Sequence, residues 1–596
     1  MRTDFPCVAL LVCSLSVSPV VVGSERGAGE PLPQVPDRNA CHVGVTAQST
    51  LLLPFLLRQA ETRPFTADVI PTGEAAEGLP PLFDDLGTLR MAVTTDSDAA
   101  QRYFDQGLRL SYAFNHAEAR RAFEAARRFD SACAMCFWGE ALVLGPNINA
   151  PMFPEAVEPA HAAVLRAQAL AGAASDREQA LIGALAQRYD DRPDADRAAL
   201  DTAYADAMAE VADRFPEDDE VQVLYAESLM NLSAWDYWHP GGEKPKGRSG
   251  EMIVALEQVL DRNPDHPGAI HLYIHAVEAS AAPERALPHA RRLADLMPAA
   301  GHIVHMPAHI YYRLGLYRQS LEANIDAVAA DERYFEQSAS DPFYRNGYYP
   351  HNLHFLMVSA QMGGDAATAL ETADKLDDVI DLDFVRFAAA LQPIKAAPYF
   401  THAQFSEPET IFALPDPGDE FVLMKALWHY ARAVAYTTAG RFDEAEGEIA
   451  ALAAIESVAD FGPLTESGVP GREVVQIAHI VAGGRLADAR GDLTAAADAY
   501  REAIAVEDTL AYMEPPYWYY PIRQSLGAVL LRSGRIEDAE LAFRQSLERV
   551  PNNGWALYGL QQVYRLSGDE RAERRVTEKL DDAWFGERGL LDLKRL

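Results

Sequence analysis

Histidines recur along the middle of the chain at a fixed spacing, and this spacing constrains the fold more than any other feature. The step along the sequence from His271 to His305 equals the step from His275 to His309. A pattern that returns about every 34 residues indicates a stack of repeated structural units, each packed against its neighbours. Matched spacing therefore predicts that the histidines occupy matched positions in successive units.

A third stretch continues the pattern with one insertion. The step from His302 to His351 equals the step from His305 to His354, and it is longer than the first step. The inserted sequence lies within the stretch DERYFEQSASDPFYRNGYYP, which is rich in tyrosine and phenylalanine. We expect it to fold over the repeats as a lid.

The chain from about residue 96 to its end is predicted to be helical. It is rich in alanine, its apolar residues recur at intervals of three and four, and short turns separate the periodic stretches. No convincing strand pattern appears. On a helix, His302, His305 and His309 share one face, because each residue advances the helix by about 100°.

Glycine, alanine and aromatic residues recur at fixed spacings within the repeated units, in a pattern similar to that of a known family. Residues 98–150 and about 215–580 resemble the tetratricopeptide repeat family, and this resemblance implies an all-α helical solenoid. The residues that carry it are Gly107, Ala119, Phe123 and Ala126, then Gly315 and Tyr317, Gly440 and Ala445, Gly491, Ala496, Tyr500 and Ala503, and finally Gly534, Ala539, Phe543 and Pro551.

The resemblance also implies where the histidines point. With Gly315 at position 15 of a repeat, His302, His305 and His309 stand at positions 2, 5 and 9. In the family, positions 2, 5, 9 and 12 line the concave groove in which ligands bind. The resemblance therefore implies that the histidines face a groove rather than the packed core between helices.

The N-terminus predicts an exported protein, and the whole sequence divides into five predicted regions. Arg2 precedes an apolar run that ends near Gly23 and Ser24, which is the form of a secretory signal and implies a periplasmic or secreted protein. The predicted regions are a signal peptide (1–24), an irregular N-terminal segment (25–95), a central array with the histidine groove (96–375), a proline-rich linker (376–420) and a C-terminal repeat array (421–596).

Charge argues against a nucleic-acid partner, and hydropathy argues against a membrane span beyond the signal. The chain of 596 residues has a formal net charge of −36 and a pI of about 4.8. Such a charge repels phosphate backbones, so we expect no nucleic-acid partner. No stretch beyond the signal is long and apolar enough to span a membrane.

Clustered imidazoles predict a transition-metal site. Imidazole suits Cu, Fe and Zn, and a carboxylate can complete a mixed nitrogen and oxygen ligand set. Two alternatives stay open: the histidines bind a non-metal ligand, or they satisfy one another structurally. The candidate metal ligands are His271, His275, Glu278, His302, His305, His309, His351 and His354.

Further aromatic and polar residues are candidates for lining the same groove. They would contact a small-molecule substrate or a peptide or protein ligand, although each of them could equally close a core. These residues are Tyr312, Tyr344, Tyr348, Trp235, Asp236, Trp238, Asn147 and Asn149.

Cys133 and Cys136 form a C-x-x-C motif outside the histidine stretches. No strand–helix–strand setting of the thioredoxin type surrounds it, and no histidine follows for haem attachment. A structural disulfide or a thiol pair is favoured over a metal site or redox catalysis.

Two hypotheses for function follow from the sequence. In the first, the histidine groove binds a transition metal, for chemistry on a small molecule or peptide or for metal handling. In the second, the chain is a non-catalytic scaffold that binds other proteins, the common role of the family it resembles. The motifs do not decide whether the protein is an enzyme.

Overall fold

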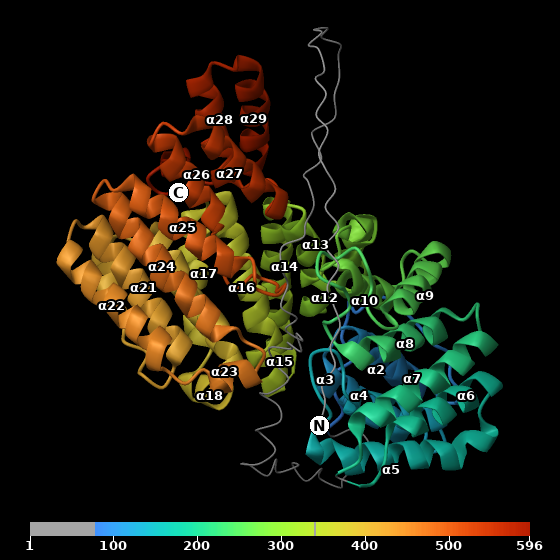
Figure 1. Ribbon diagram of the computed structural model, residues 1–596. Helices are drawn as coiled ribbons and strands as arrows, with labels where there is room; N and C mark the ends of the chain where they lie inside the picture. The colour runs from blue at the N-terminus through green and yellow to red at the C-terminus, as the bar shows by residue number, and fades with distance from the viewer. Residues whose placement is uncertain (1–77, 193, 339–340) are drawn as a thin grey trace, which may run out of the picture. The chain divides into compact units, whose positions relative to one another are not determined.

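The computed structural model describes residues 78–192, 194–338 and 341–596, which form α-helices joined by short turns (Figure 1). No β-strand occurs among these residues, which hold two isolated bridges instead. Each long helix packs most extensively against a helix close to it in the sequence. The predicted all-α helical solenoid is therefore confirmed.

The first helices carry the repeat packing that the sequence predicts. Phe123 of α3 is fully buried between α2 and α4, where a Cβ added to Gly107 or Gly139 would lie 2.7 and 2.4 Å from its ring. Gly527 stands in the same relation to Phe543 in the C-terminal repeats. The helices of this block are α2 (Asp98–Tyr112), α3 (His116–Phe129), α4 (Ala134–Leu144), α5 (Pro154–Leu170), α6 (Asp176–Leu185), α7 (Arg197–Arg214), α8 (Asp219–Met230) and α9 (Ser249–Arg262).

The central helices carry the histidines. The second histidine stretch is divided at Pro307, which lacks an N–H for the helical hydrogen-bond ladder. The central helices are α10 (Pro267–Val277), α11 (Leu287–Leu296), α12 (Gly301–His305), α13 (Pro307–Arg313), α14 (Tyr317–Gln337), α15 (Pro342–Asn346), α16 (Tyr348–Gly363) and α17 (Ala366–Val379).

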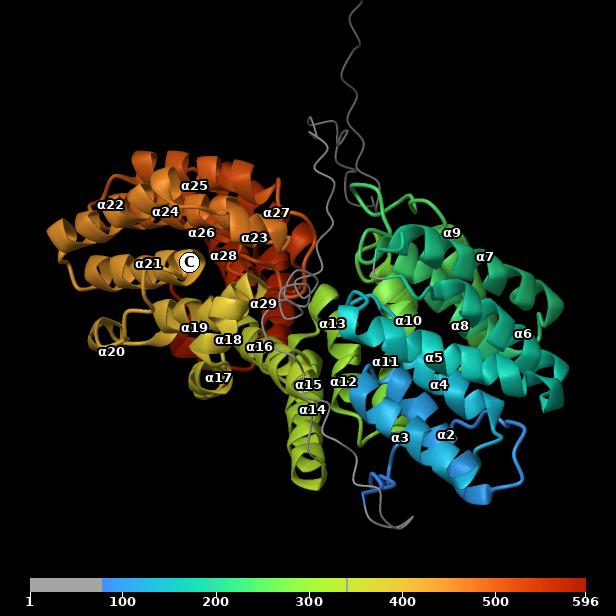
Figure 2. The ribbon, with the colours of Figure 1, turned by 90° about the horizontal axis from the view of Figure 1, so that it is seen from below.

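Helices continue through the segment predicted as a linker. Within residues 376–420, α19 packs against both α17 and α21, so this segment belongs to the helical stack. The remaining helices are α18 (Leu382–Phe387), α19 (Gln392–Phe405), α20 (Pro408–Phe412), α21 (Val422–Thr438), α22 (Phe442–Val458), α23 (Gly462–Glu466), α24 (Gly471–Ala489), α25 (Leu493–Glu507), α26 (Ile522–Arg532), α27 (Ile536–Arg549), α28 (Gly554–Ser567) and α29 (Glu570–Ala583). Among them, α22, α24 and α25 lie side by side, as in a repeat array (Figure 2).

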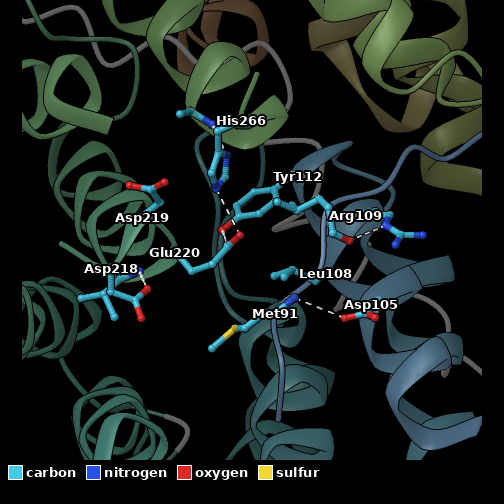
Figure 3. Close-up of polar contacts among 12 residues, drawn as sticks. Met91, Asp105, Leu108, Arg109, Tyr112, Asp218, Asp219, Glu220 and His266 are labelled. Atoms are coloured by element: carbon cyan, nitrogen blue, oxygen red, sulfur yellow. Dashed lines mark hydrogen bonds and ion pairs between the residues drawn. The ribbon is translucent and has the colours of Figure 1, made fainter. Parts of the chain in front are cut away.

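The N-terminal segment is described only from residue 78, so the predicted signal peptide lies outside the described residues. Residues 78–97 precede α2 and contain no helix. They run along α2, where the Met91 backbone N–H donates to the Asp105 carboxylate (3.3 Å, Figure 3). None of the described helices is long and apolar enough to cross a membrane.

Candidate metal centre

Six imidazoles from three regions of the chain meet in one cluster. His271 and His275 come from α10, His302 and His305 from α12, His309 from α13, and His351 from α16. Ring centroids of neighbouring members lie as close as 4.8 Å, and only His351 is partly exposed. Two triads of ring nitrogens, each within 4.8 Å, are His271, His275 and His302 (the first triad) and His305, His309 and His351 (the second triad).

The cluster is buried, which differs from the open groove that the family resemblance implies. His305 has no exposed surface, and His309 is 2% exposed. The Phe114 ring from the α2–α3 turn lies 4.4 Å from the His271 ring, and the Tyr512 hydroxyl reaches Glu278 from the loop between α25 and α26. Segments distant in sequence thus cover the face that is open in a simple repeat array.

Hydrogen bonds from the Nδ1 atoms fix four of the six rings. His271 donates to the Tyr112 carbonyl (2.6 Å), and His305 to the Asn324 side-chain oxygen (2.6 Å). Asn324 donates its own amide to a backbone carbonyl, which assigns its oxygen as the acceptor. The remaining two donors, His275 (2.9 Å) and His309 (2.6 Å), share the carboxylate of Glu278.

These bonds direct the Nε2 lone pairs inward. When Nδ1 of a neutral imidazole carries the proton, Nε2 is an acceptor or a metal ligand. The Nε2 atoms of His305 and His309 are 2.9 Å apart, and those of His309 and His351 are 3.5 Å apart. Two nitrogens bound to one tetrahedral zinc lie about 3.3 Å apart, given bonds of about 2.0–2.1 Å. The second triad thus has nearly the spacing that a metal requires.

The first triad has a similar arrangement. The Nε2 atoms of His271 and His302 are 3.2 Å apart. The Nε2 atom of His275 is buried and has no hydrogen-bond partner among the described residues. Each triad thus presents nitrogen atoms that need a proton or a cation to satisfy them.

Electrostatics separate the Glu278–His309 pair from the rest of the cluster. Burial lowers the pKa of His271, His302, His305 and His351 well below the ordinary value, and neighbouring imidazoles add to this effect. Burial alone would also lower the pKa of His309, but the Glu278 carboxylate outweighs it and raises that pKa. For Glu278 burial opposes ionisation, yet His309 and the two imidazole hydrogen bonds hold its pKa below the usual range.

A second buried network holds the backbone that orients His271. The Tyr112 hydroxyl donates to Glu220 (2.6 Å), and the His266 ring nitrogen lies 3.2 Å from the same carboxylate (Figure 3). His266 also caps α10 by accepting the Ala269 N–H. This network joins the end of α2 to the start of α10, and so fixes the Tyr112 carbonyl relative to His271.

Two of the predicted metal ligands, Glu278 and His354, lie outside the two triads. Glu278 lies behind the rings and accepts from Nδ1 atoms, although its oxygens also lie within 4.8 Å of the nitrogens of His275 and His309. His354 belongs to neither triad: it lies next to the Tyr519 ring (5.8 Å), and its two nitrogens have no partner among the described residues.

Three of the predicted ligand-contacting residues lie beside the cluster. The Trp235 ring is 4.9 Å from the His275 ring, and the Tyr348 ring is 4.7 Å from the His302 ring. Asn149 donates to the Tyr348 hydroxyl (3.1 Å). These side chains form part of the wall around the first triad.

The other five predicted contacts have mainly structural partners. Tyr312 packs against Tyr317 and Phe355, and Tyr344 donates to Asp331 while accepting the His302 backbone N–H. The last three have local partners: Trp238 donates to the Ala276 carbonyl, Asp236 pairs with Lys246, and Asn147 accepts the Asn149 N–H.

Sequence reasoning missed four residues of the site, namely Phe114, Asn324, Tyr512 and Glu514. Tyr512 donates to Glu514, whose pKa is raised to about 7 by burial and by the nearby Glu278 charge. The signal for this loop is the off-repeat sequence AYMEPPYWYYP, but its contact with Glu278 spans 234 residues. Asn324 offers a weaker signal, an amide within the helical stretch EANIDAVAA.

Cys133 and Cys136 are joined by a disulfide at the start of α4. Both residues are fully buried. Neither cysteine belongs to a group of possible metal ligands among the described residues.

Comparisons with known proteins return distant helical-repeat structures. No protein-family model and no curated protein sequence matches the chain. A human IFIT1 dimer with PPP-AAAA is 14% identical and has a TM-score of 0.29, covering 81% of this chain and 90% of that one. Naa15/Naa10 bound to HypK-THB is 14% identical (TM-score 0.26, 83% and 85% covered), and the APC/C hetero-tetramer Cut9–Hcn1 is 13% identical (TM-score 0.28, 82% and 78% covered).

Proposed function

We propose that this chain is a metal-binding helical-repeat protein whose histidine cluster holds transition-metal ions, one in each triad. The observation that carries the proposal is the convergence of Nε2 atoms in each triad, where two of the three imidazoles already donate Nδ1–H to an acceptor. The Nε2 atoms of His305 and His309 lie 2.9 Å apart in a buried site, so either a shared proton or a metal cation must lie between them to prevent repulsion of their lone pairs. A cation between them removes that repulsion, and the outer acceptors hold the rings in the binding tautomer.

The ligand set favours copper, iron or zinc. Three imidazoles without thiolates suit these borderline metals, and three protein ligands leave a position for a small molecule. A centre of this kind supports metal-dependent chemistry on a small molecule. An extended peptide would reach these histidines only by displacing covering residues such as Phe114 and Tyr512.

Elemental analysis of the full chain, purified without a His tag or chelator, tests the proposal. We expect stoichiometric Cu, Fe or Zn, and loss of that metal in the His305→Ala/His309→Ala variant. The matched control is His429→Ala/His479→Ala, which removes two histidines paired with Glu448 and Glu456 outside the cluster. Absence of metal in the wild type, with none taken up on titration, would contradict the proposal, as would equal loss in both variants.

We also infer that the protein works in an oxidising compartment, in the periplasm or outside the cell. The Cys133–Cys136 disulfide supports this inference, because disulfides persist mainly in such compartments. Thiol labelling of denatured, unreduced protein taken from its native compartment tests it. Protection of both cysteines is expected, and labelling of both would contradict the inference.

A further inference from the structure

A small cavity opens beside the second triad. Its volume is about 20 Å³, and its polar wall consists of His351 and His354 from α16 and Glu514 from the α25–α26 loop. The rest of the wall is mainly apolar and includes Phe400 and Val474. Tyr517 and Tyr519 also line it, and their hydroxyls donate to backbone carbonyls. A volume of this size holds about one water-sized molecule.

Three polar atoms of this wall, both ring nitrogens of His354 and one carboxylate oxygen of Glu514, have no hydrogen-bond partner among the described residues. His354 is 5% exposed, and neither of its ring nitrogens has a hydrogen-bond partner among the described residues. Glu514 is 7% exposed; one of its oxygens accepts from Tyr512, and the other is likewise unpartnered within the described chain. Burying an unsatisfied polar group costs about 1–3 kcal/mol, so two such residues at one cavity indicate a ligand that satisfies them.

The position of the cavity relates it to the metal. His351 lines it and also belongs to the second triad, where its Nε2 is 3.5 Å from that of His309. A metal held by three imidazoles has an open coordination position, which a water or a substrate atom fills.

We propose that this cavity holds the exchangeable, non-protein ligand of the metal in the second triad, with Glu514 and His354 as its hydrogen-bond partners. This inference rests on the proposed metal site. The ligand class is a water-sized molecule, meaning water, hydroxide or a small inorganic anion. A larger substrate would place only its reacting end there, because pockets that enclose a drug-sized molecule measure about 300–1,000 Å³.

Azide titration of the Co(II)-loaded full chain, followed by visible absorption, tests the proposal. Val474→Phe fills the apolar side of the cavity, and we expect it to weaken azide binding at least tenfold while Co(II) stoichiometry stays unchanged. The matched control is Leu86→Phe, which fills a second cavity of about 20 Å³ that the histidines do not line. This control should bind azide as the wild type does.

Glu514→Gln gives an independent test with the opposite sign. It replaces a buried carboxylate with an amide that donates a hydrogen bond, so azide should bind about tenfold more tightly. Bound Co(II) with no azide response in the wild type, or with an azide affinity that Val474→Phe and Glu514→Gln leave unchanged, would overturn the cavity proposal alone. Failure of Co(II) to bind at the triads would overturn the metal site as well.

Discussion

Two regions of the molecule occupy the same place in the repeat but carry different side chains. One is the consecutive pair α12 and α13, and the other is the later helix α26. Each is followed by a glycine with positive φ, Gly315 at 71° and Gly534 at 80°. Counting back from these glycines, His305 corresponds to Gln524, and His309 corresponds to Ala528. All four side chains are buried.

The difference lies in the partners of these positions. Gln524 accepts from Asn553 within its own repeats, a bond between neutral groups. His305 and His309 instead have Asn324 and Glu278 behind them as acceptors, with their Nε2 atoms facing each other. The backbone of the repeat therefore supplies positions, and the side chains with their outer acceptors supply the site.

The largest effect is expected when this difference is erased. The His305→Gln/His309→Ala variant gives the central repeat the residues of α26. We expect the affinity of the second triad for metal to fall at least about 1,000-fold, or about 4 kcal/mol. Competition with a chelator of known affinity measures it, and circular dichroism should show unchanged helix content. Retained affinity would mean that the metal lies elsewhere.

Metal should stabilise the two regions unequally. A ligand present at 100 times its Kd stabilises the state that binds it by about 2.7 kcal/mol. Amide hydrogen exchange should therefore slow in α10, α12, α13 and α16, and change little in α28 and α29. Equal slowing in both regions would contradict a site confined to the central helices.

Removing the shared acceptor should have an intermediate effect. Glu278→Gln keeps the shape of the side chain but no longer holds two Nδ1–H donors with a charge, and loss of such outer partners weakens metal binding about 10- to 100-fold. Glu448→Gln is the control, because Glu448 accepts from His429 on the C-terminal helices (2.6 Å). Isothermal titration calorimetry measures the metal affinity of the two variants. Equal affinities would contradict the role of Glu278 as an outer acceptor that supports metal binding.

The dependence of metal affinity on pH should be the smallest of these effects. Glu278 raises the pKa of His309 above the ordinary 6.5, so His309 holds a proton in a range where the other cluster imidazoles are neutral. Metal must displace that proton, so affinity should rise by up to about tenfold per pH unit below the raised pKa and level off above it. In Glu278→Gln this slope should move to lower pH, and an unshifted slope would contradict the coupling.

Local patterns were sufficient to predict the helices and the histidine face. The regular spacing predicted the matched positions of His271 and His305, and small residues such as Gly107 predicted where helices approach. Periodicity alone could not predict burial of the site. The contact from Tyr512 to Glu278 depends on how the C-terminal repeats return to the central ones, and no local pattern encodes it.

The role of Glu278 was also beyond the sequence. Its spacing from His275 placed a carboxylate on the histidine face, and both a ligand and an outer acceptor satisfy that spacing. Only the side-chain geometry distinguishes a metal ligand from an outer acceptor. The Glu278 carboxylate contacts the Nδ1 atoms of two imidazoles, while the Nε2 atoms converge on the other side of the rings. The sequence likewise could not place His354 outside the two triads, where its ring lies next to Tyr519 and lines the cavity.

The measurement that tests the central claim most directly is anomalous X-ray diffraction from crystals of the metal-loaded protein, recorded at the absorption edge of the metal. We predict anomalous peaks about 2.0–2.1 Å from the Nε2 atoms of the two triads. Glu278 should still accept hydrogen bonds from the Nδ1 atoms of His275 and His309. Peaks confined to surface carboxylates, or a metal bound directly to Glu278 on the Nδ1 side, would contradict the account.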